Sequence, residues 1–253
     1  MNKEIERAFN RTTKIVIGKE LLHLSDYGRW LTSNVKPPIK QPSALSKRLI
    51  FIQPFSFFNS VRKRAVKLDE APEFGKKSLS KEEVKELTLE NATEKLKDIG
   101  YFTTEVIRGN NLSVEESGTY ADSSYCFNGT LFVNSKYCAY CLWPRESEYS
   151  FGSSFIFSSK FCLKCHHSIN LTRCFEVSHS ANCSDCYFCH NCDNLQDCMF
   201  CFNTKNKRYS IANVELERKE YLRIKKILLD FINKELDKKK SLELSIFNIG
   251  VTG

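Results

Sequence analysis

A period of twelve residues constrains the fold of this chain more than any other feature. Counting in twelves from Cys126 to Cys198 gives cysteine at six of the seven positions and serine, Ser150, at the remaining one. A second column lies three residues later, and the two columns together contain ten of the chain's 12 cysteines. Self-similarity at a fixed period is the signature of repeat architectures, and seven repeats align here without a gap.

Neighbouring positions follow the same period. The residue after the first column is apolar in all seven repeats. Asparagine recurs in a further column, at Asn134, Asn170, Asn182, Asn194 and Asn206. Because asparagine tolerates left-handed backbone, this column predicts a turn in each repeat.

The period predicts a narrow β-solenoid. Twelve residues are too few for a helical-hairpin repeat, which needs about 34. We expect each coil to have two short strands and two tight turns, with coils stacked about 4.8 Å apart. Cysteine, serine, glycine and valine are small enough to fill so thin an interior. Two repeats per larger coil is an alternative that the sequence leaves open.

The flanks complete an α+β architecture. We expect a mainly helical N-terminal region over 1–119, seven solenoid coils over 120–204, and a C-terminal capping helix and tail over 205–253. An amphipathic helix over 217–240 would cover one open end of the solenoid and the N-terminal region the other, because open ends expose unpaired backbone. Within 1–119, the run 49–58 suggests a buried strand, and Ser80 with Glu83 has the form of a capping box.

The compartment follows from what the sequence lacks. A secretory signal requires an apolar run, but the first residues carry mixed charges and no such run follows them. The longest apolar stretch, 49–58, is too short to span a bilayer. We therefore expect a soluble, cytoplasmic protein with no membrane partner, or a virion protein if the source is viral. In a reducing compartment its thiols would be free or bind metal.

Zinc is one explanation of the cysteines. Cys162, Cys165, Cys183 and Cys186 have spacing typical of a four-cysteine zinc site. Paired cysteines in the last repeats could also converge, and Cys183 lies off the two main columns, so the last two coils are favoured. The candidate zinc ligands are Cys162, Cys165, Cys183, Cys186, Cys189, Cys198 and Cys201.

A reduced, metal-free ladder of packed thiols is the other explanation. It accounts for Gly129, Ser150, Ser153 and Val177, which take the place of cysteine in the same columns. Catalysis is not expected, because no cysteine–histidine pair lies in a recognisable local signature. No Walker A, G-x-G-x-x-G or H-E-x-x-H motif occurs either.

Charge points to a second kind of partner. The chain carries a formal net charge of +8, and its basic excess lies outside the cysteine segment. Candidate nucleic-acid contacts form two clusters, one of Arg62, Lys63, Arg64 and Lys67 and one of Lys219, Arg223 and Lys226. The simpler reading of such clusters is a solvated surface, because acidic residues lie near each of them.

The last repeats resemble a family of uncharacterised cysteine-repeat proteins from archaeal, candidate-phylum bacterial and phage genomes. The resembling residues are 189–203 (CHNCDNLQDCMFCFN), 206–213 (NKRYSIAN) and the pair Glu220-Tyr221, within a region of 120–232. The resemblance implies a repeat fold that ends in a helix. It implies no activity, and its phage members suggest a virion or assembly role.

Two functional hypotheses follow. The first is a non-catalytic scaffold or assembly protein that presents a cysteine-rich solenoid to a protein partner and could itself form oligomers. The alternative is a zinc-stabilised nucleic-acid-binding protein.

Overall fold

The computed structural model describes residues 2–251, which form two compact units. The first unit joins the chain before Pro38 to Arg108–Glu116 and to the residues from Tyr120 onward. The second contains Pro38–Ile107 and Ser117–Thr119. Each unit is described by itself.

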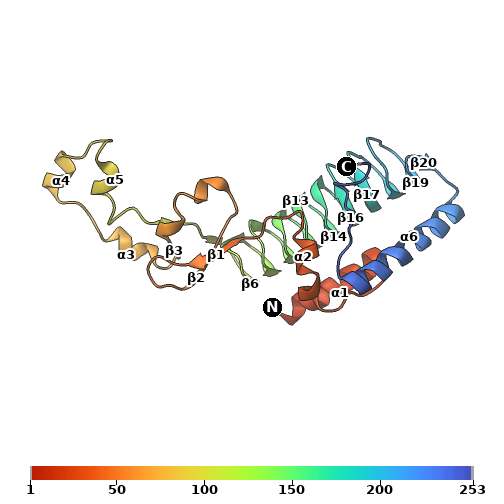
Figure 1. The fold of residues 1–253 in the computed structure, drawn as a ribbon, viewed down its shortest axis with the longest axis horizontal. Helices are drawn as coiled ribbons and strands as arrows, with labels where there is room; N and C mark the ends of the chain where they lie inside the picture. The colour runs from red at the N-terminus through yellow and green to blue at the C-terminus, as the bar shows by residue number, and fades with distance from the viewer. Residues whose placement is uncertain (1, 252–253) are drawn as a thin grey trace. The chain divides into compact units, whose positions relative to one another are not determined.

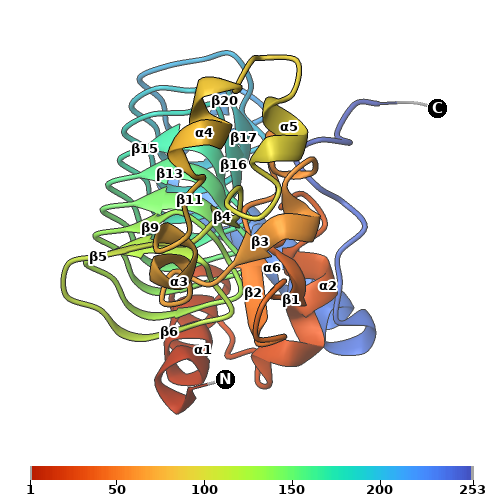
Figure 2. The ribbon, with the colours of Figure 1, turned by 90° about the vertical axis from the view of Figure 1, so that its left-hand side faces the viewer.

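A parallel β-solenoid dominates the first unit. Each residue pairs with the residue twelve positions later, so that Cys138 lies beside Ser150 and Ser150 beside Cys162. One repeat therefore makes one coil, and the larger two-repeat coil is excluded. In Figure 2 the strands β9 (Phe132–Val133), β11 (Leu142–Arg145), β13 (Ser154–Phe157) and β15 (His166–Ile169) lie one above another.

The stack is longer than the seven coils predicted. Nine strands follow one another on one side within residues 2–251: β6 (Leu112–Glu115), β8 (Ser124–Phe127), β10 (Lys136–Ala139), β12 (Glu148–Phe151), β14 (Lys160–Leu163), β16 (Thr172–Ser178), β17 (Ser184–His190), β18 (Gln196–Met199) and β19 (Arg208–Ile211). Val114 pairs with Cys126 and Ser210 with Cys198. Val114 and Ser210 thus extend the first column at its two ends. Counting only cysteines missed these two coils.

Each coil has four sides as well as the two short strands and two tight turns predicted: in 136–147, β10 and β11 are each followed by two residues outside strands. From Asp122 to Ala212, every third residue has a φ between 43° and 66°, and Gly152 alone among them is glycine. The residue after each left-handed position is buried throughout 123–201. A side is therefore three residues long, with one side chain inward and two outward. All five residues of the predicted asparagine column have positive φ, which confirms that turn.

All twelve cysteines point into the interior. They are free thiols and all are buried. Cys183 and Cys192, which lie outside the two columns recognised in the sequence, occupy the other two of the four interior columns. Their position is explained by the four-sided coil, so it no longer favours a metal site in the last coils.

Helix α1 (Lys3–Ile17) covers a side of the solenoid, not its end. Asn2 caps the helix by accepting a hydrogen bond from the amide of Glu4, and Gly18 ends it with a φ of 81°. The buried face packs against the apolar column that includes Phe151, Leu163 and Phe175. The helix contacts successive strands from β8 to β16. The expectation of an N-terminal end cap was wrong for this helix, because its apolar face is buried against the outward apolar column.

Helix α6 (Arg218–Lys239) begins and ends within one residue of its predicted bounds, but it too lies along a side (Figure 1). Lys225 Nζ lies 3.5 Å from Asp197 Oδ1 and over the ring of Tyr187, both outward residues. Farther along, Asn233 donates a hydrogen bond to the carbonyl of Ile17 at the end of α1. The capping role predicted for this helix therefore belongs to other residues.

The last coil is closed by a short strand and one side chain. Strand β20 (Val214–Glu215) pairs antiparallel with β19. The amide group of Asn213 accepts a hydrogen bond from the Phe202 amide at 3.0 Å and donates one to the Phe202 carbonyl at 2.9 Å. Asn213 thus supplies the hydrogen bonds that the backbone of a further coil would make.

The second unit is built of short elements. Strand β1 (Ile39–Pro42) pairs antiparallel with β2 (Leu49–Ile52), and β3 (Ala65–Val66) pairs parallel with β4 (Phe102–Thr103). Its helical turns are η2 (Ser56–Phe58), η3 (Arg62–Arg64), α3 (Ala71–Gly75), α4 (Lys81–Lys85) and α5 (Ala92–Lys95). The capping box of Ser80 and Glu83 is confirmed, whereas the strand predicted over 49–58 keeps only its first four residues. Across the described residues, no helix combines the length and the apolar character needed to cross a bilayer.

Candidate binding surface

The seven cysteines proposed as zinc ligands all lie in the solenoid interior. Each sulfur contacts backbone carbonyls of its own coil and, in most cases, of the next one. Cys189 Sγ lies 3.4 Å from the carbonyl oxygen of Tyr187 and 3.8 Å from that of Cys198. Cys201 Sγ lies 3.5 Å from the carbonyl of Met199 and 3.7 Å from that of Ser210. These contacts suit a neutral thiol that donates to a carbonyl.

Burial opposes ionisation of most of these thiols. It raises the pKa of Cys165 and Cys189 well above the usual value. Cys183 and Cys201 differ. A hydrogen bond with Cys186 lowers the pKa of Cys183, and hydrogen bonds with Cys189 and Cys198 lower that of Cys201. A zinc ligand must be a thiolate. Within residues 2–251, no group of three or more His, Cys, Asp or Glu side chains is arranged to hold a metal ion. The contacts thus favour packing, and zinc stays a prediction.

The basic residues proposed to bind nucleic acid lie in both units. In the second unit, Arg64 donates to the carbonyl of Gly100 at 2.6 Å and stacks over the ring of Tyr101. Lys67 forms an ion pair with Glu105 at 3.0 Å. Both residues are thus held by the protein, whereas Arg62 and Lys63 line an open pocket.

The other basic cluster lies on α6 in the first unit. Lys219, Arg223 and Lys226 are exposed on that helix, as predicted. Arg223 is paired with Glu220 through two hydrogen bonds of 2.9 and 2.7 Å. Its charge is therefore partly neutralised, whereas Lys219 and Lys226 form no ion pair with any residue of 2–251.

One uncovered side of the solenoid forms a groove of about 780 Å³. Its first wall is a column of left-handed residues, His167, His179, Asn191 and Asn203. Its second wall is the outward column Ile169, Ala181, Asp193 and Lys205. Ile169 is 44% exposed, so an apolar side chain faces solvent beside charged ones. Sequence reasoning missed this surface, because it did not separate inward from outward columns.

The first wall is ordered by contacts between neighbouring coils. The rings of Phe155 and His167 stack at 4.7 Å, and those of His167 and His179 at 5.0 Å. Farther along, Asn191 donates to the side-chain oxygen of Asn203 at 2.9 Å. Partial burial and the neighbouring His179 lower the pKa of His167, which keeps its imidazole neutral near pH 7. The wall is thus a regular array of stacked rings and hydrogen-bonded amides.

A buried ion pair joins both ends of the chain to the solenoid. Lys164 donates to the Trp30 carbonyl at 3.0 Å and to Ser33 Oγ at 2.7 Å. Its Nζ lies 3.6 Å from Glu176 Oε1, with both side chains almost fully buried. Glu176 in turn accepts a hydrogen bond from the Ile246 amide at 2.9 Å. This pair was missed in the sequence, where neither residue stands out, and it is a structural clamp.

Serine–histidine pairs recur on the side next to the groove. His166 Nδ1 is hydrogen-bonded to Ser154 Oγ, and His190 Nδ1 to Ser178 Oγ, both at 2.8 Å. Ser154 and Ser178 are buried, so neither hydroxyl is presented to a substrate. Burial lowers the pKa of His166 to about 3. These pairs support packing between coils.

Comparison with known proteins does not assign the chain to a family. No protein-family model matches the sequence. A search of curated proteins also gave no match.

Proposed function

We propose that this protein is a non-catalytic scaffold that binds a protein partner along the uncovered side of its solenoid. The groove between the column that begins at His167 and the column that begins at Ile169 is the observation that carries the proposal. Solenoids characteristically use such extended, regular faces for binding.

The chemistry of the groove supports a protein as the partner. It combines exposed Ile169 with the imidazoles of His167 and His179, and Asp193 and Lys205 lie farther along the same side. Mixed apolar, polar and charged groups of this kind are typical of non-obligate protein interfaces. The cysteines contribute indirectly, because they fill the interior and so fix the spacing of the outward columns.

The resemblance to proteins encoded by phages supports an assembly role. A rigid rod with a repeated surface would position a partner at a fixed distance, and a virion or an assembly intermediate is one setting for that task. Cytoplasmic location before assembly belongs to the same proposal.

Site-specific photo-crosslinking tests the proposal. A photoreactive residue replaces Ala181, in the middle of the groove, or Ser184, an outward residue on the neighbouring side of the stack. In extract of the native source we expect a discrete protein adduct from position 181 that is absent from position 184. Equal adducts from both positions, or none from either, would contradict the proposal.

A further inference from the structure

We propose that the second compact unit binds single-stranded nucleic acid at a basic pocket beside the exposed ring of Phe57, which stacks on the half-buried Phe55. The pocket has a volume of about 480 Å³ and is lined by Lys47, Arg62 and Lys63 together with Ser43 and Asn59. No carboxylate lines it, so its charge is complementary to a phosphodiester backbone.

All three cations have donors available to a ligand. Arg62 Nε donates to Gln41 Oε1 at 2.9 Å, and its two terminal nitrogens have no acceptor among the described residues. That orientation leaves part of the guanidinium free for phosphate oxygens. Lys63 forms no ion pair within the described chain. Lys47 Nζ makes one long contact, of 3.3 Å, with the carbonyl of Ala44.

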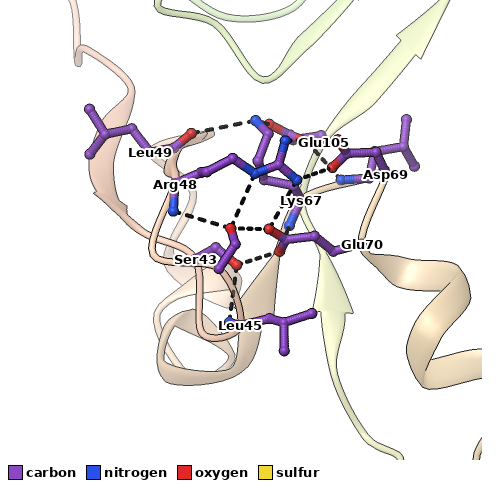
Figure 3. Close-up of polar contacts among 10 residues, drawn as sticks. Ser43, Leu45, Arg48, Leu49, Lys67, Asp69, Glu70 and Glu105 are labelled. Atoms are coloured by element: carbon purple, nitrogen blue, oxygen red, sulfur yellow. Dashed lines mark hydrogen bonds and ion pairs between the residues drawn. The ribbon is translucent and has the colours of Figure 1, made fainter.

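Residues 43–48, the loop that includes Lys47, are held by hydrogen bonds to Glu70 (Figure 3). Glu70 is 5% exposed and accepts hydrogen bonds from the side chains of Ser43, Ser46 and Arg48. Burial alone would raise the pKa of Glu70, but these bonds and the Lys67 amide lower it to about 2. Arg48 is also paired with Asp69 at 2.9 and 2.8 Å. Asp69 and Glu70 are thus engaged by Arg48 and the two serines, and among the described residues neither forms an ion pair with a cation that lines the pocket.

Stacking surface lies in the adjacent segment. Phe57 is 66% exposed, and its ring lies 5.6 Å from that of Phe55 at an interplanar angle of 15°. Phe57 precedes by two residues Asn59, which lines the pocket. Exposed aromatic rings beside a basic groove are the combination by which proteins hold unpaired bases and backbone together. Duplex DNA would satisfy the cations but leave the rings without bases to stack on.

The structure also separates this site from the other basic residues that the sequence suggested. Arg64 and Lys67 are engaged with Gly100, Tyr101 and Glu105, and they support the unit itself. Lys219 and Lys226 lie on α6 in the first unit and have no exposed aromatic stack with a basic pocket beside them. They provide a control that removes the same number of charges.

Fluorescence anisotropy of the full chain with a labelled oligothymidine tests the inference. The variants are K47Q/K63Q, F57A and the control K219Q/K226Q, with circular dichroism to verify folding. We expect K47Q/K63Q to lower the slope of log K against log salt by about 1.4, that is about 0.7 for each lost phosphate contact. We expect F57A to weaken binding at least about fivefold. The control should bind as the unaltered chain does.

Three results would overturn the inference. The first is that the folded, unaltered chain does not bind the oligothymidine at about 50 mM salt. The second is equal loss in K219Q/K226Q and K47Q/K63Q, which would indicate general charge attraction. The third is binding to phosphatidylserine-containing vesicles that F57A abolishes, without binding of oligothymidine, which would assign the surface to a membrane.

Discussion

Left-handed backbone at every third residue is costly for side chains with a Cβ atom, by about 1–2 kcal/mol each. This chain places tyrosine, phenylalanine, lysine and arginine there as well as asparagine. The cost is offset between coils, where outward side chains contact the side chains twelve residues away in the same column. Tyr125 and Tyr137 stack at 5.2 Å, and Arg173 forms a two-point ion pair with Asp185. Strain within each coil is thus balanced by contacts between coils, which a single repeat could not supply.

Two cysteine substitutions distinguish packed thiols from a metal site. In a ladder of packed thiols, Cys138→Ser and Cys201→Ser should each cost about 1–3 kcal/mol, because both positions are buried and serine already stands at Ser150. Denaturant unfolding measures the two costs, and elemental analysis of protein purified under reducing conditions measures zinc. Release of zinc by Cys201→Ser alone, with a much larger cost than Cys138→Ser, would establish coordination.

His166 makes stability depend on pH. Its pKa of about 3 in the folded protein is depressed by burial, so below its ordinary value of 6.5 the unfolded chain binds a proton that the folded chain does not. Stability is therefore lost as pH falls from about 6.5 toward 3, by about 2–3 kcal/mol at pH 4.5 from this group. His166→Leu should remove that part of the loss, since Leu142 already stands in the same column. Urea unfolding at pH 7 and pH 4.5 checks this, and an unchanged difference between the two pH values would argue against it.

At the scale of elements, the sequence predicts the bounds of helix α6 well but not the place where the helix packs on the solenoid. The apolar stripe of α6 gave its bounds, yet both α1 and α6 lie on a side of the solenoid. The signal for that placement is the apolar column that includes Phe151 and Phe175, which is outward in a four-sided coil and needs cover. The sequence analysis did not separate inward from outward columns, and it therefore misplaced the helices.

The end cap depends on Asn213, for which the chain offers a matched control. Asn213→Ala removes two hydrogen bonds to Phe202, whereas Asn206→Ala affects another asparagine with positive φ. Both changes place alanine in left-handed backbone, so their strain is similar. We expect only Asn213→Ala to promote self-association, because it exposes a strand edge. Light scattering against concentration measures this, and equal association in the two variants would remove Asn213 from the cap.

For the whole molecule, the period of twelve residues predicted the solenoid, and a second period of three residues would have predicted the shape of each coil. Every spacing between two cysteines in this chain is a multiple of three, from the three residues between Cys186 and Cys189 to the twelve between Cys126 and Cys138. That sub-period specifies four inward residues per coil and unites Cys183 and Cys192 with the rest. The clamp between Lys164 and Glu176 could not be predicted, because its partners Trp30 and Ile246 are far apart in sequence.

Native-state thiol labelling, read residue by residue by mass spectrometry, tests the central claim that every cysteine faces the interior of a narrow four-sided coil. All twelve thiols should resist a small alkylating reagent until denaturant unfolds the solenoid, and a strong zinc chelator should not change their rates. Rapid labelling of Cys183 or Cys192 in the native protein would contradict the four-sided coil. Labelling of the last coils that begins only when the chelator is added would show that metal, not packing, protects them.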